Sequence, residues 1–255
     1  AGFAIAERMS AQIRGLNMAT KNANDGLSML ATVENATNDV TDMLQRIREL
    51  AVQAANDTNS LEDRTFLQTE VNSLLQEINR VATHTIYNNK VVLDGTLSGD
   101  FQVGTEKGQT ISFDIKSIDT DTLELTDKTG DPTFATGTYV IDADAASDKT
   151  GTAGAISILT ATDATNSLEK ISAALEQVAG NRAVYGALQN RLEYTVSNLM
   201  NVAEFTTSAR SRIEDADFAA ESARLAKAQV LQQTGTAMLA QANAAPQLAL
   251  QLIRN

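Results

Sequence analysis

Few side chains of this 255-residue chain could carry out chemistry. It contains no cysteine and a single histidine, His84, so a thiolate metal site, a cysteine nucleophile and a multi-histidine metal site are all excluded. A Ser–His triad would have to use His84, which falls near the predicted end of a helix and complements the helix dipole there. No carboxylate pair stands out as general acid and base, and no glycine-rich loop is typical of phosphate binding. We therefore expect neither an enzyme nor a cofactor.

Two acidic pairs are the remaining candidates for a metal site. Asp119/Asp121 and Asp142/Asp144 have the spacing that begins a calcium loop, but Leu and Ala stand where a third ligand belongs and no loop glycine follows. A solvated acidic surface explains them better. We expect no metal.

Composition narrows the class of protein further. The chain has 20 Lys and Arg against 32 Asp and Glu, a net charge of −12, which disfavours nucleic acid because that binding depends on clustered cations. No apolar run reaches the roughly 18–20 residues that span a bilayer, so we expect no membrane insertion. With 4% aromatic residues, much alanine and two prolines, the sequence suits long helices packed along narrow seams.

Helical periodicity dominates both ends of the sequence. Apolar residues recur at intervals of three and four along residues 1–57 and again along 61–84, and a polar turn at 56–60 separates these helices. Ser60 and Asp63 form a predicted capping box, and the short connection makes the two helices antiparallel. We expect a third helix at 165–207 and a fourth at 212–255, which Ser211 and Glu214 would cap.

The middle of the chain has a period of two. Phe101 and Val103, then Ile111, Phe113 and Ile115, alternate with polar residues and predict a β-hairpin near 97–116. Asn88-Asn89 and Asp94-Gly95 predict turns before it. The apolar pieces 139–141 and 156–159 would fit strands within an acidic, threonine-rich segment.

These elements predict a mainly α fold with a small β part: an antiparallel, coiled-coil-like bundle of long helices, a β-hairpin region and a short β-rich variable insertion. The helical rod core comprises 1–117 and 160–211, the variable surface insertion 118–159, and a C-terminal filament-core helix 212–255. The narrow seams bring distant parts of the chain together into an elongated building block.

Four segments resemble bacterial flagellin. They are residues 21–28 (KNANDGLS), 44–56 (LQRIRELAVQAAN), 208–217 (SARSRIEDAD) and 239–243 (LAQAN). The resemblance covers roughly 1–117 and 160–255. It implies a secreted structural subunit of the extracellular flagellar filament, which forms a helical homopolymer with other flagellin subunits through its terminal helical regions for motility. The related alternative is the hook–filament junction protein.

The resemblance also implies an N-terminally shortened chain. Flagellins of this kind begin with further residues that carry the export signal and pair with the last helix. On that expectation the chain polymerises poorly alone, and the last helix is ordered only by contact with another molecule.

The resemblance assigns contact residues as well. Gln45, Arg46, Leu50 and Glu70 match positions that Toll-like receptor 5 of hosts binds and that the filament buries. We expect Leu50 to be an exposed apolar residue that shares a face with Arg46.

The last helix resembles the segment that a dedicated export chaperone holds before secretion. Leu250, Leu252 and Ile253 match a C-terminal apolar cluster sensed by intracellular innate receptors.

A surface binding protein that uses the acidic insertion is the rival hypothesis. Deleting 120–160 discriminates between the two, because a filament subunit would keep its fold and helix contacts, whereas the rival would lose its function.

Overall fold

The computed structural model describes residues 2–125, 156–215 and 218–253, with side chains described for 221–243 in the last range. The elements are α1 (Gly2–Ala54), α2 (Leu61–His84), β1 (Ile86–Tyr87), β2 (Lys90–Val91), β3 (Ser98–Gln102), β4 (Thr110–Asp114), α3 (Ala161–Glu214) and α4 (Phe218–Ile253). The chain forms two compact units: a larger unit, Arg14–Ala203, and a smaller unit, Ala1–Ile13 with Glu204–Asn255.

In the larger unit, α1 and α2 pair along their apolar stripes. Leu44, Ile47 and Ala51 of α1 are fully buried, and α2 buries Val71 and Ile78 against the same core. These are the seams predicted from the 3–4 spacing, and the fold class is confirmed.

The capping box that begins α2 is also confirmed. Asp63 N–H donates to Ser60 Oγ at 3.2 Å, and Ser60 N–H donates back to the Asp63 carboxylate at 3.0 Å. These bonds satisfy backbone donors that the first turn of a helix leaves without partners. The polar turn between α1 and α2 therefore ends where the sequence places it.

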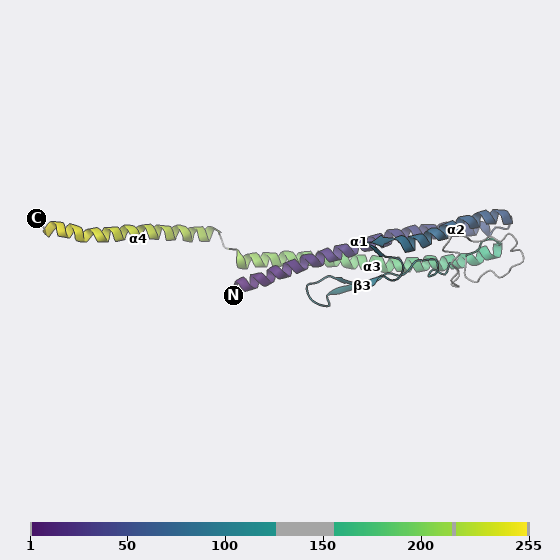
Figure 1. Cartoon of the computed structure of the whole chain (residues 1–255), viewed down its shortest axis with the longest axis horizontal. Helices are drawn as coiled ribbons and strands as arrows, with labels where there is room; N and C mark the ends of the chain where they lie inside the picture. Colours follow the sequence, from purple (N-terminus) through teal and green to yellow (C-terminus); the bar gives the residue numbers. More distant parts are fainter. Residues whose placement is uncertain (1, 126–155, 216–217, 254–255) are drawn as a thin grey trace. The chain divides into compact units, whose positions relative to one another are not determined.

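The third long helix, α3, lies beside α1 and α2 (Figure 1) and runs antiparallel to α1. Gln189 Nε2 donates to Glu34 Oε2 at 3.0 Å, and Leu199, ten residues further along α3, packs against Leu16, near the other end of α1. The helix begins after Thr160, whose Oγ1 accepts from Asp163 N–H at 3.1 Å, a cap that was not predicted from the sequence.

The end of α3 corrects one prediction. Ser211 does not cap a fourth helix but lies inside the last turns of α3, where its hydroxyl donates to the Asp215 carboxylate. Ser211 therefore pairs with a side chain one turn later and not with the backbone of a new helix. The fourth helix, α4, begins at Phe218 instead.

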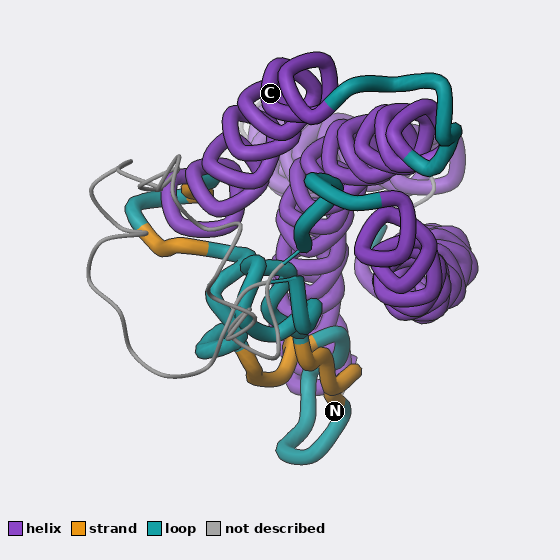
Figure 2. The backbone as a smooth tube through the Cα atoms, turned by 90° about the vertical axis from the view of Figure 1, so that its right-hand side faces the viewer, coloured by secondary structure: helices purple, strands orange, loops and turns teal. Residues whose placement is uncertain are grey.

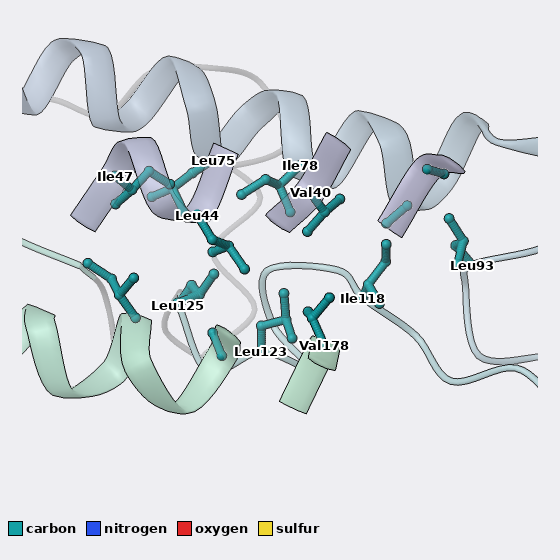
Figure 3. Packing of buried hydrophobic residues seen from close by; sticks show 14 of the residues in the cluster. Val40, Leu44, Ile47, Leu75, Ile78, Leu93, Ile118, Leu123, Leu125 and Val178 are labelled. Atoms are coloured by element: carbon teal, nitrogen blue, oxygen red, sulfur yellow. The ribbon is translucent and has the colours of Figure 1, made fainter. Parts of the chain in front are cut away.

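A non-helical segment completes the core between the helix pair and α3. Figure 3 shows Ile118, Leu123 and Leu125 pointing into the space between α1, α2 and the Val178 face of α3. Ile156 and Ile158 on the return side are also buried.

The prediction of a strand at 156–159 is wrong, because no strand forms there. Instead, the side chain of Gln68, fully buried on α2, pairs with the backbone of this segment. Ile158 N–H donates to Gln68 Oε1 at 2.7 Å, and Gln68 Nε2 donates to Ile156 O at 3.3 Å and to Asn72 Oδ1 at 2.9 Å. Ile156 N–H donates to Leu125 O at 3.1 Å, so the two residues that flank 126–155 lie side by side. The predicted strand at 139–141 lies outside the described residues.

Two short ribbons lie beside the long helices (Figure 2). β1 pairs with β2 through a tight turn in which Asn88 and Asn89 have φ of 46° and 64°, and β3 pairs with β4 in antiparallel register with Phe101 opposite Ile111. The predicted hairpin and turns are confirmed. The strand pair β1–β2 was not anticipated, because two-residue strands leave no periodicity.

The β3–β4 hairpin sits on α1 where that helix has no side chain. A Cβ on Gly26 would lie 3.0 Å from the Phe101 ring, and one on Gly15 would lie 2.7 Å from Thr105 Cγ2. Between them, Asn22 Nδ2 donates to Gln102 O at 3.1 Å. Both glycines interrupt the helical pattern in the sequence because the hairpin approaches so closely.

In the smaller unit, the ends of α1 and α3 pack together, and Arg210 Nη1 donates to Ser10 Oγ at 3.2 Å. α4 is different: every side chain described between 221 and 243 is exposed. Its large apolar residues include Leu225, Val230, Leu231, Met238 and Leu239, which are 57–69% exposed. Across the described part of the chain, no helix has both the length and the apolarity to cross a membrane.

Candidate interaction surface

The α1–α2 pair presents a polar cluster at mid-length. Arg46 Nε donates to Glu70 Oε1 at 2.8 Å across the two helices, and Arg46 Nη1 donates to Glu49 Oε2 at 3.0 Å along α1. The α1 and α2 stripes bring these residues together because both helices bury their apolar faces and leave this edge in solvent. The hydrogen bond to Glu70, followed by the one to Glu49, raises the pKa of Arg46, so its guanidinium stays charged.

The cluster remains open to solvent. The side chains of Arg46 and Glu70 are 49% and 44% exposed, and Gln45 beside them is exposed as well. Exposed ion pairs contribute little to stability. Their planar, paired donors and acceptors are instead available to a partner. Three of the four residues assigned by resemblance therefore form one accessible surface.

Leu50 is the exception, and the expectation that it is exposed is wrong. Its side chain is 1% exposed and belongs to the core of the larger unit. It follows Ile47 by three residues, so it extends the buried stripe instead of flanking it. Truncating it to alanine would cost about 2–5 kcal/mol of stability through cavity formation, whatever it does for binding.

Phe66 supplies the exposed apolar side chain that Leu50 does not. It precedes Glu70 by one turn of α2 and is 67% exposed. The sequence contains a signal for this exposure. Phe66 lies outside the apolar stripe Leu67–Val71–Leu74–Ile78, so it is a large aromatic residue at a position where the periodicity predicts contact with solvent. We refer to Gln45, Arg46, Phe66 and Glu70 as the α1–α2 patch.

The structure describes only some of the other candidate residues. Leu250, Leu252 and Ile253 lie in the last turns of α4, outside the residues whose side chains are described. Asp119 Oδ1 accepts from Thr122 N–H at 2.6 Å, as in an ordinary turn. In 2–125 and 156–215, as in the described part of α4, no three His, Cys, Asp or Glu side chains gather to hold a metal ion. The pair Asp142/Asp144 lies outside the described residues.

His84 ends α2, with Nδ1 at 2.9 Å from Thr83 Oγ1 and 3.2 Å from Arg80 O. That is the helix-terminal position predicted for it.

Long helices with buried seams, an exposed polar patch and the exposed apolar side chains of α4 between 221 and 243 are typical of a structural protein that assembles with other chains. Residues 1–98 match the bacterial flagellin N-terminal helical region, and residues 168–253 match the bacterial flagellin C-terminal helical region. The chain belongs to the bacterial flagellin family, and it is a structural subunit of the extracellular flagellar filament.

Individual relatives agree. The chain is 38% identical to a flagellin of Halalkalibacterium halodurans over 255 residues, covering 100% of this chain and 84% of the relative. It is 40% identical to a flagellin of Bacillus subtilis over 268 residues, covering 100% and 86%. The crystal structure of Bacillus cereus flagellin superposes with a TM-score of 0.53 at 25% identity, over 70% of this chain and 88% of that one.

Proposed function

We propose that the chain assembles with copies of itself through α4 and the α1–α2 patch. The observation that carries this proposal is the contrast between the two units. The larger unit buries the apolar stripes of α1, α2 and α3, whereas α4 leaves Leu225, Leu231 and Leu239 at 61–65% exposure. Exposed apolar surface of this extent is typical of a protein–protein interface. Copies joined by heterologous contacts that do not close form a helical filament.

Sedimentation of filaments from purified chain, alone and on preformed flagellin seeds, tests the proposal. Leu225→Ser with Leu239→Ser should abolish incorporation while leaving the circular dichroism of the larger unit unchanged. The matched control is Thr236→Ser, a conservative change on the same helix. Normal incorporation of the double variant would contradict the role of α4.

We infer further that Toll-like receptor 5 of hosts binds the α1–α2 patch of the free subunit. The resemblance assigns Gln45, Arg46 and Glu70 to this role, and their exposure makes them accessible to a receptor. Arg46→Ala and Glu70→Ala should each weaken receptor binding tenfold or more, as removal of a hot-spot residue does. The control is Arg48→Ala, another exposed arginine of α1.

Leu50→Ala belongs in the same experiment as a stability control. Binding by Arg46→Ala and Glu70→Ala equal to that of the parent chain would refute the assignment. A loss seen only in Leu50→Ala would indicate damage to the core.

The C-terminal segment has a separate proposed role. Leu250, Leu252 and Ile253 form part of the segment that an export chaperone holds before secretion, and intracellular innate receptors sense the same apolar cluster. Replacing all three by serine should weaken both interactions in pull-down assays with the purified chaperone and receptor. A matched set of serine replacements at Ala244, Ala245 and Ala249 keeps the length and alters small residues only.

The rival function is ligand binding by the acidic insertion without a filament. A deletion in this insertion tests it, and the structure shows which residues the deletion has to spare. Residues 120–125 and 156–158 contribute Leu123, Leu125, Ile156 and Ile158 to the core, so deletion of 120–160 would damage the fold itself. Replacing 126–155 by a short glycine linker joins two residues that already lie side by side. A filament subunit should retain folding and incorporation, and loss of incorporation by a folded variant would contradict the structural role.

A further inference from the structure

Two of the exposed apolar residues of the larger unit, Phe66 and Met18, have neighbours of opposite charge. Phe66 on α2 has Glu62 and Asp63 one turn before it and Glu70 one turn after it, all exposed. Arg46, which pairs with Glu70, is the cation facing this group from α1. Phe66 is therefore an aromatic anchor in acidic surroundings.

Met18 on α1 is 56% exposed and has the opposite surroundings. Arg14 precedes it by one turn, and Lys21 follows it by three residues, so the three side chains share one helical face. Asp25 lies one turn beyond Lys21 and is exposed. Met18 is thus an adaptable apolar side chain between two cations.

We propose that these two patches meet between copies: the Phe66 patch of one subunit (Glu62, Asp63, Phe66, Glu70) receives the Met18 patch (Arg14, Met18, Lys21) of the next. This inference rests on the proposed assembly and identifies which surface of the second copy the α1–α2 patch contacts. The charges are complementary, and the apolar residues at both centres can pack on each other. Aromatic anchors ringed by charge are typical of contact hot spots.

The geometry makes the contact head-to-tail. Met18 lies 28 residues before Arg46 on one continuous helix. Arg46 pairs with Glu70 of the antiparallel helix α2, and Phe66 lies one turn before Glu70, which places it one turn further from Met18. At about 1.5 Å per residue the two patches are roughly 45–50 Å apart along α1, so they cannot meet within one chain. A contact between two different patches is heterologous, and where its rotation does not close a ring it repeats along a filament.

The absence of cysteine from the sequence allows a direct test. Thr69→Cys places a thiol beside Phe66, and Asn17→Cys places one beside Met18; both positions are exposed, and neither change removes an anchor. A mixture of the two single-cysteine variants, grown on flagellin seeds and treated with a short bis-maleimide, should give a covalent dimer. Filaments of either variant alone should not, because each patch meets the other kind and not its own.

Charge exchange provides the second arm. Phe66→Asp, Lys21→Glu and Glu62→Lys should each raise the critical concentration for assembly, Phe66→Asp by about tenfold or more. The double variant Lys21→Glu with Glu62→Lys should restore it. The matched control is Val184→Asp, at an exposed apolar residue of α3, which should change it less than twofold.

The outcomes separate the two proposals. Filaments that form without the mixed dimer and without charge rescue would overturn this contact and leave assembly intact. Failure of the parent chain to form filaments, alone or on seeds, would overturn both. Loss of receptor binding in Phe66→Asp with unchanged critical concentration would assign the patch to the receptor instead.

Discussion

Replacing Gln68 tests how the segment after residue 155 is held in the core. The Gln68 side chain is fully buried, and its amide is hydrogen-bonded to the backbone of Ile156 and Ile158. Gln68→Leu keeps a similar volume but leaves the Ile158 N–H and the Ile156 carbonyl group buried without partners. Each such loss costs about 1–3 kcal/mol. The 2.7 Å bond from Ile158 N–H carries most of the effect, because the bond to Ile156 O is longer at 3.3 Å.

We therefore expect Gln68→Leu to lower the free energy of unfolding by about 2–4 kcal/mol, which for a domain of this size is a fall in Tm of roughly 5–15 °C. Urea unfolding followed by circular dichroism measures it, and the midpoint should fall without a change in slope. Amide exchange adds a local readout, since the Ile158 amide should lose protection.

Two controls isolate the backbone bonds. Asn72→Ala removes one partner of Gln68 but leaves the bonds to Ile156 and Ile158, so we expect a loss below about 1 kcal/mol. Thr69→Ala, exposed on the next position of α2, should stay within about 0.5 kcal/mol. Stability of Gln68→Leu within that same range, with Ile158 still protected, would refute the reasoning.

Three further changes have expected outcomes. Tyr185 is buried and its hydroxyl accepts from Lys116 N–H at 3.0 Å, so Tyr185→Phe should cost about 1–2 kcal/mol in urea unfolding. Burial raises the pKa of Tyr185. Its contribution to stability is complete below about pH 10 and is lost as pH rises through the folded pKa, so the parent should lose more stability than Tyr185→Phe as the pH rises above about 10. Hydrogen bonds from Ser60 lower the pKa of Asp63. Their contribution to stability is present above about pH 4 and is lost as pH falls through the folded pKa. The difference in Tm between the parent and Ser60→Ala should therefore be smaller at about pH 3 than at about pH 6. Arg64→Ala removes bonds of 2.8 and 3.2 Å to carbonyl groups at the end of α1, and it should cost about 1–3 kcal/mol and speed amide exchange over 55–60.

Local signals explain what the sequence could predict. The 3–4 spacing of α1 and α2, the Ser60 cap and the period-two alternation around Phe101 are each encoded within a few residues. The burial of these apolar residues then follows, because a narrow apolar stripe on a helix is stable only when it packs against another apolar stripe.

The missed features depend on contacts between distant residues. Ile156 and Ile158 have the composition of a strand, yet the donor and acceptor that a neighbouring strand would supply come from Gln68, 88 positions away in the chain from Ile156. Ser211 and Glu214 have the spacing of a capping box, but α3 continues past Ser211, where its end packs on the start of α1. Leu50 is buried although we expected it to be exposed, because the exposed edge of a two-helix pair depends on how both helices are rotated.

Gly15 and Gly26, the two α1 glycines beneath the β3–β4 hairpin, determine how the hairpin is aligned on the helix. Phe101 fits over Gly26 while Thr105 fits over Gly15, and these glycines are eleven residues apart on one helical face. Sliding the ribbon one turn toward the amino end would put Asn22 beneath the aromatic ring and Ala11 beneath the threonine. Reversing its direction would exchange a broad ring with a small methyl group. The two glycines thus fix both the direction and the register of the hairpin on α1.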